Sequence, residues 1–140
     1  MPHPVEITDA DVDEVVDLWR RCGLTRPWND PIDDIALARR GADATILVVR
    51  ETGRLIATVM VGFDGHRGWV YYLAVDPDRQ GGGLGRAIMD AAEGWLKARG
   101  APKIQLMVRD DNVAALGFYD RLGFERQAVV TLGKRLDGRG

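Results

Sequence analysis

The most informative stretch of the sequence is residues 69–86, which read WVYYLAVDPDRQGGGLGR. Residues 69–75 carry no charge and show no alternation of polar and apolar side chains, which is typical of a central strand covered on both faces. The strand ends at Asp76-Pro77, and a glycine-rich turn leads into a helix that Gly100 closes as a C-cap. The stretch therefore predicts a buried strand, a glycine turn and a helix in direct succession.

The turn and the helix start together predict an anion-binding site. The first N–H groups of a helix have no intrahelical acceptor, and the helix dipole is positive at that end. Glycines leave these N–H groups unshielded and allow positive φ angles. Four of them occur close together, at Gly81, Gly82, Gly83 and Gly85. Because Arg79 and Arg86 add positive charge, we expect the turn to hold a pyrophosphate.

Two better-known phosphate loops do not fit this turn. A P-loop requires Gly-Lys-Ser/Thr after its glycines, whereas this helix begins Leu84-Gly85-Arg86. The dinucleotide pattern G-x-G-x-x-G would require a glycine at Ile88 or at Arg86, depending on where it starts. A nucleoside triphosphatase and a Rossmann fold are therefore both excluded.

The rest of the sequence predicts alternating strands and helices along the whole chain. Strands are expected at residues 5–7, 45–50, 55–63, 69–75, 103–108, 124–127 and 129–134. Helices are expected after Thr8, over residues 32–40, after the glycine turn, and from Asn112 to a cap at Gly123. Thr52-Gly53 and residues 64–68 are expected to be hairpin turns, so the strands around them pair antiparallel. The predicted order is β-α-α-β-β-β-α-β-α-β-β.

Length and composition limit the function classes. A chain of 140 residues predicts one domain over residues 1–140, and 46% apolar with 29% charged residues is the balance of an ordinary globular protein. The net charge of -2 argues against nucleic-acid binding. Cys22 is the single cysteine, so we expect neither a disulfide nor a metal site. Without an apolar span or a signal-like start, we expect a cytoplasmic protein that does not bind membranes.

The glycine turn resembles the acetyl-CoA motif of the GNAT superfamily of N-acetyltransferases, Arg/Gln-x-x-Gly-x-Gly/Ala. Residues 80–85 match this motif, and the strand end at residues 73–77 has the Leu-Ala-Val and proline that precede it in the family. A second hallmark is an asparagine that opens the next helix, a tyrosine seven residues later and a Leu-Gly-Phe end; Asn112, Tyr119 and residues 122–124 stand in these places. Residues 26–31, 64–68, 98–105 and 132–136 look like the small bacterial YpeA-type acetyltransferases.

The resemblance implies an α+β (α/β) GNAT fold, with a mixed, mostly antiparallel sheet of about seven strands flanked by four helices. It also implies acetyl-CoA as cosubstrate, no metal, and direct attack by a primary amine in a ternary complex. The implied cofactor-binding residues are Leu73, Ala74, Val75, Gln80, Gly81, Gly82, Gly83, Leu84, Gly85, Arg86, Asn112 and Tyr119. Tyr119 is the expected acid that protonates the leaving thiolate. Asn112 is expected either to bind the pantetheine arm or to hold the start of its helix.

Several points stay open on the sequence alone. An acceptor ammonium must lose its proton before it attacks, but Asp30, Asp64, His66 and Tyr72 are all conceivable bases and none is singled out. The acceptor could be a small molecule, a peptide N-terminus or a lysine. An acetyl-CoA-binding sensor or regulatory module with little catalysis is the alternative function. A homodimer through a strand at Val129–Lys134 is conceivable.

Overall fold

The computed structural model describes residues 3–138 of the chain. Contacts divide the chain into two compact units, Met1–Leu106 and Met107–Gly140, and each is described by itself. Within residues 3–138, the first unit contains the sheet and three α-helices, and the second contains one α-helix. A single domain over the whole chain stays a prediction.

The helices and strands confirm most of the expected order. They are β1 (Val5–Glu6), a 3₁₀ helix (Asp9–Asp11), α1 (Val12–Arg21), α2 (Pro31–Ala38), β2 (Ala44–Glu51), β3 (Arg54–Phe63), β4 (Gly68–Val75), a second 3₁₀ helix (Pro77–Arg79), α3 (Leu84–Ala98), β5 (Ile104–Gln105) and α4 (Val113–Arg121).

The sheet has five strands in the order β1-β2-β3-β4-β5, and every neighbouring pair is antiparallel except the parallel pair β4–β5. The expectation of about seven strands was therefore wrong. The expected strand 103–108 shrinks to β5, and residues 124–127 and 129–134 form no strand within the described chain. A strand exists only when a neighbour accepts and donates its backbone hydrogen bonds, and these segments pair with none of the described strands.

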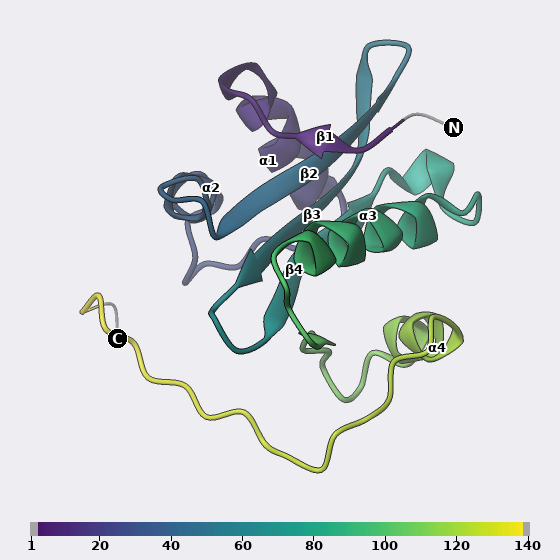
Figure 1. The fold of residues 1–140 in the computed structure, drawn as a ribbon. Helices are drawn as coiled ribbons and strands as arrows, with labels where there is room; N and C mark the ends of the chain where they lie inside the picture. The colour runs from purple at the N-terminus through teal and green to yellow at the C-terminus, as the bar shows by residue number, and fades with distance from the viewer. Residues whose placement is uncertain (1–2, 139–140) are drawn as a thin grey trace. The chain divides into compact units, whose positions relative to one another are not determined.

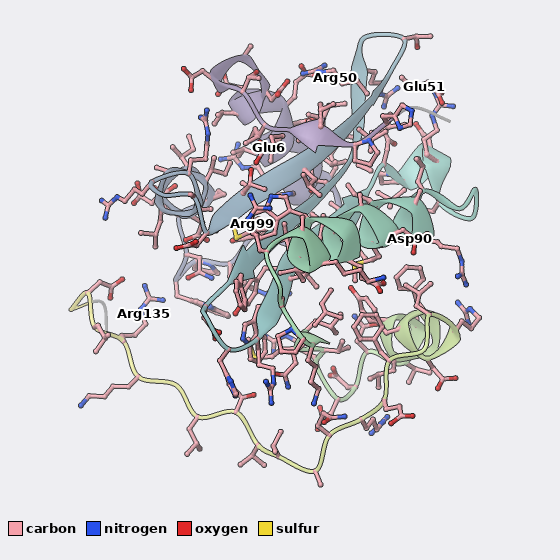
Figure 2. All side chains as sticks on the ribbon, viewed as in Figure 1. Glu6, Arg50, Glu51, Asp90, Arg99 and Arg135 are labelled. Carbon is pink, nitrogen blue, oxygen red and sulfur yellow. The ribbon has the colours of Figure 1, made fainter. Side chains whose placement is uncertain are left out.

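The turn between β2 and β3 is the hairpin that the sequence predicts. Thr52 and Gly53 have φ angles of 49° and 80°, and two central residues with positive φ are what the strand twist favours in a two-residue hairpin. Arg50 donates from its guanidinium to the Gly53 carbonyl at 2.8 Å. Figure 2 labels Arg50 and Glu51 near this end of the hairpin.

Helices cover both faces of the sheet, which explains why β2 to β4 lack a polar face. Figure 1 shows α3 across the front of the strands and α1 behind them. Ile46 and Val48 of β2 belong to the buried cluster that also contains Trp19 from α1 and Ile35 from α2. The helix α3 turns its own buried stripe inward, with Leu84, Ile88, Met89, Ala92 and Leu96.

Close packing of α3 requires a glycine at the start of β4. A Cβ atom at Gly68 would lie 2.4 Å from Leu96 Cδ1, well inside van der Waals contact. Gly68 also donates its N–H to the Lys103 carbonyl at 2.8 Å, which starts the pairing with β5. The glycine therefore lets the last turn of α3 approach the sheet where β4 and β5 meet.

Candidate functional site

The outer edge of β4 is only partly paired. β4 pairs with β3 from Gly68 to Val75, but with β5 only through Gly68 and Trp69. No strand of the described residues pairs with this edge beyond Trp69. The backbone around Leu73 to Val75 is therefore at an edge that an extended ligand could reach.

The direction of the backbone groups at this edge follows from one hydrogen bond. Asp76 donates its N–H to the Ile56 carbonyl of β3 at 2.8 Å, so the groups of Asp76 point toward β3. Successive residues of a strand alternate, so the groups of Val75 point outward. The Val75 carbonyl is already occupied, because it accepts from Cys22 Sγ at 3.3 Å and from Gln80 Nε2 at 3.2 Å.

The strand β4 contains a bulge at its centre. Met60 pairs with Tyr71 and Thr58 with Ala74, so Val59 of β3 faces two residues of β4. Tyr72 is one of the two and has a φ of 53°, in the left-handed region that non-glycine residues seldom adopt. The bulge comes directly before Leu73.

Asp76 fixes the turn that follows β4. Its carboxylate is 1% exposed, accepts from Asp78 N at 2.9 Å, and forms ion pairs with Arg54 at 2.9 Å and Arg21 at 3.4 Å. The Asp78 N–H bond, which outweighs the opposing effect of burial, and the two arginine charges hold the pKa of Asp76 below its usual value. We did not single out Asp76, Arg21 or Arg54 from the sequence; an Asp-Pro pair directly after a buried strand was the available signal.

The glycine turn leads into a helix whose first N–H groups face no side-chain cap. Gly81 and Gly83 both have a φ of 85°, which explains the need for glycine at these two positions. The first intrahelical bond of α3 runs from Ala87 N to the Gly83 carbonyl at 3.0 Å, and within the described residues no side chain caps this end. The preceding N–H groups, of Leu84, Gly85 and Arg86, are the expected anion donors.

The two arginines near the glycine turn, Arg79 and Arg86, differ in how free their charges are to bind an anion. Arg79 forms an ion pair with Glu51 at 2.9 Å, so its charge is partly balanced. The Arg86 side chain is exposed at the start of α3, and the first turn of this helix carries no acidic residue. An incoming anion would therefore meet the backbone dipole and Arg86.

Asn112 and Tyr119 lie in the second unit. Asn112 Oδ1 accepts from Ala115 N at 3.1 Å and so caps α4, which is one of the two roles expected for it. The Tyr119 ring makes edge contacts with Phe118 and Phe124, with ring centroids 5.0 and 5.6 Å apart. Burial raises the pKa of Tyr119 to about 12, so its hydroxyl stays protonated at neutral pH.

Asp30 and Asp64, two of the four conceivable bases, accept hydrogen bonds from nearby backbone N–H groups. Asp30 caps α2 and accepts from Ile32 N at 2.9 Å. Asp64 accepts from His66 N at 2.8 Å and Arg67 N at 2.7 Å, and these backbone bonds, that of Arg67 first, lower the pKa of Asp64. Tyr72 donates its hydroxyl to Asp34 Oδ2 at 2.6 Å.

The described residues contain neither a candidate metal-binding cluster nor a candidate membrane-spanning helix. Among residues 3–138 no three His, Cys, Asp or Glu side chains gather in a group that could hold a metal ion. Over the same residues, no helix has both the length and the apolar character needed to cross a membrane.

The chain is similar to known acetyltransferases in sequence and in fold. The model of the acetyltransferase (GNAT) family matches residues 12–124. The ribosomal-protein-S18-alanine N-acetyltransferase of Escherichia coli has a TM-score of 0.78 at 26% identity, over 91% of this chain and 79% of the other.

Two more distant structures share the fold. Glucosamine-6-phosphate N-acetyltransferase of Arabidopsis thaliana has a TM-score of 0.75 at 21% identity, over 98% of this chain and 99% of the other. AAC(6')-Iy, solved with the bisubstrate analogue CoA-S-monomethyl-acetylneamine, has a TM-score of 0.83 at 13% identity, over 96% and 99%. Because the family model covers residues 12–124, well over half of the sequence, this chain belongs to the acetyltransferase (GNAT) family.

Proposed function

We propose that this protein transfers the acetyl group of acetyl-CoA to a primary amine. The observation that carries the proposal is the succession of an unpaired edge on β4, a glycine turn with two positive φ angles, and an α3 N-terminus without a side-chain cap. An extended chain that ends in a pyrophosphate fits this succession, because the edge accepts amides and the helix start accepts anions. The CoA part of the analogue bound by AAC(6')-Iy is such a ligand.

The pyrophosphate would lie on the N–H groups of residues 81–86, with Arg86 nearby. The pantetheine arm would lie along the open edge of β4, beside the outward-pointing backbone groups of Leu73 and Val75. Since the Val75 carbonyl is occupied by Cys22 and Gln80, its N–H is the group of Val75 left for a ligand. We assign this N–H to the thioester carbonyl, where it would stabilise negative charge as the amine attacks.

Tyr119 is the proposed acid. When the amine attacks the thioester, the carbon–sulfur bond breaks and the sulfur leaves as a thiolate, which a neighbouring hydroxyl can protonate. Burial raises the pKa of Tyr119 to about 12, so its hydroxyl carries a proton at neutral pH but is a weaker acid than that of an exposed tyrosine. Asn112 contributes by fixing the start of α4, the helix that carries Tyr119.

The acceptor is proposed only as a class, a primary amine. The names of the similar structures include a protein alanine, a sugar amine and an aminoglycoside derivative, so the shared fold serves amines of different size. An assay should therefore compare an alanine-initiated peptide, glucosamine 6-phosphate, an aminoglycoside and a lysine peptide, with CoA release as the readout.

The first test is calorimetric titration with acetyl-CoA. Gly82 is the best position for a block, since its φ is not positive and a Cβ atom there would only touch the Arg79 carbonyl at 3.5 Å. Gly82→Asp should weaken binding by about 100-fold or more, because a carboxylate meets the phosphates at close range. Gly94→Asp, which adds the same charge where a Cβ atom has open space, is the matched control and should bind like the wild type. Absence of binding to the wild-type protein would overturn the proposal.

The second test separates enzyme from sensor. Tyr119→Phe should keep the acetyl-CoA affinity and lower kcat by about 10²-fold or more with any amine that the wild type accepts. An unchanged kcat would remove Tyr119 as the acid. If the wild type binds acetyl-CoA tightly but none of the tested amines leads to the release of CoA, the result would favour an acetyl-CoA-binding sensor.

A further inference from the structure

The bulge in β4 is held by side chains that come from three other elements. A positive φ at a non-glycine residue costs conformational free energy, so the surrounding structure must enforce it. Tyr72 is the residue concerned, and its carbonyl, ring and hydroxyl each have a partner. These partners explain how the bulge persists without glycine.

The carbonyl of Tyr72 is held by a directional relay. Trp19 Nε1 donates to Thr58 Oγ1 at 2.8 Å, and Thr58 Oγ1 is 3.1 Å from the Tyr72 carbonyl oxygen. An indole N–H can only donate, so the hydroxyl accepts from Trp19 and gives its own proton to the carbonyl. Trp19 and Thr58 are both fully buried, so water cannot replace either bond.

The side chain of Tyr72 is held at two further points. Its ring stacks on the Trp19 ring, with centroids 3.7 Å apart and an interplanar angle of 5°. Its hydroxyl donates to Asp34 Oδ2 at 2.6 Å, and Asp34 lies in the first turn of α2. The strand β4 is thereby fastened to α1, β3 and α2 at one residue.

We propose that Trp19, Thr58, Tyr72 and Asp34 act as a bulge clamp, a set of positioning residues that fixes the backbone of Leu73 to Val75 in the shape that binds acetyl-CoA. Without the clamp, β4 would relax toward a regular ladder with β3, and a shift by one residue reverses which backbone groups point to the open edge. The effect on acetyl-CoA rests on the proposed function; the effect on the bulge does not.

Thr58→Val tests the relay. Valine has nearly the same shape but neither accepts from Trp19 nor donates to the Tyr72 carbonyl. We expect acetyl-CoA binding to weaken by about 10-fold, the equivalent of one lost hydrogen bond. Val49→Ala, at a buried position of β2 outside the cluster that contains Trp19, is the control for lost stability and should change the affinity less than about twofold. Equal affinities in the two variants, compared at equal loss of Tm, would overturn the proposal.

Asp34 and Tyr72 are tested by a double-mutant cycle. Asp34→Ala and Tyr72→Phe should weaken binding equally, by about threefold to fivefold, and the double variant should be no weaker than either. Asp34→Asn should bind nearly like the wild type, because its amide oxygen still accepts from the Tyr72 hydroxyl. If Asp34→Asn is as weak as Asp34→Ala, the carboxylate acts through its charge on the ligand, and its positioning role is wrong.

A readout without ligand keeps this proposal separate from the proposed function. The amide NMR shifts of Tyr72, Leu73 and Ala74 should move in Thr58→Val and Tyr72→Phe but not in Val49→Ala. Unmoved shifts would overturn the clamp even if acetyl-CoA binds. Moved shifts in a protein that fails to bind acetyl-CoA would support the clamp and overturn the proposed function.

Discussion

The strand β3 and the segment 124–134 are both rich in residues that favour strands, but they differ in what surrounds them. In β3, which lies between strands β2 and β4, five residues are 0% exposed: Ile56, Ala57, Thr58, Val59 and Val61. In the segment 124–134, Val129, Val130 and Leu132 are 75%, 83% and 90% exposed. Strand propensity measures how well a side chain packs on a pleated surface, so it acts only where neighbouring strands supply that surface.

The largest effect should come from removing a side chain of β3. Ile56→Ala deletes apolar contacts at a position that is 0% exposed, and we expect a loss of about 3 kcal/mol in the free energy of unfolding. Urea unfolding followed by circular dichroism measures it. Ile32→Ala makes the same chemical change in α2, where Ile32 is 51% exposed, and should cost less than about 1 kcal/mol. Equal losses would mean that burial in β3 contributes little.

Structures with a local cause could be predicted from the sequence in both units. The Thr52-Gly53 hairpin, the glycine start of α3 and the Asn112 cap of α4 each depend on residues a few positions apart. The chain-wide resemblance correctly indicated the family.

Contacts between distant residues could not be predicted in the same way. In the bulge clamp, Trp19 and Thr58 are 39 residues apart, and Asp34 and Tyr72 are 38 apart. No local pattern signals such pairs, because only the fold brings them together. The strands expected at 124–127 and 129–134 failed for the opposite reason: the local pattern was present and the pairing partner was not.

A middle-sized effect should come from the charges that join α1 to the β2–β3 hairpin. Arg50 donates to Asp11 Oδ1 at 2.7 Å and to Glu14 Oε1 at 2.6 Å. Removing the guanidinium by Arg50→Met leaves the half-buried network without its cation, and we expect a loss of about 2 kcal/mol at pH 7. Arg39→Met, which removes a contact to the exposed Asp9, should cost less than about 0.5 kcal/mol.

The cost of Arg50→Met should depend on pH in a defined direction. Burial raises the pKa of Asp11, but the bonds from Arg50 and Thr8 outweigh it and leave the pKa below the ordinary 3.8. The bond from Arg50 also lowers the pKa of Glu14 below 4.5. Groups with a lowered folded-state pKa stabilise the fold above their ordinary pKa and lose this contribution as the pH falls. The difference in stability between the two proteins should therefore begin to shrink as the pH falls below about 4, and a constant difference would contradict this account.

The smallest effect should come from the segment 124–134. Val130→Ser replaces a side chain that is 83% exposed, so the free energy of unfolding should change by less than about 0.5 kcal/mol. Val61→Ser, the same replacement at a fully buried position of β3, should cost about 3 kcal/mol, because it leaves a cavity and buries a hydroxyl. A loss above about 1 kcal/mol at Val130 would show that this segment is packed in solution. Unfolding at two protein concentrations would then separate packing within one chain from pairing between two copies, since only the second depends on concentration.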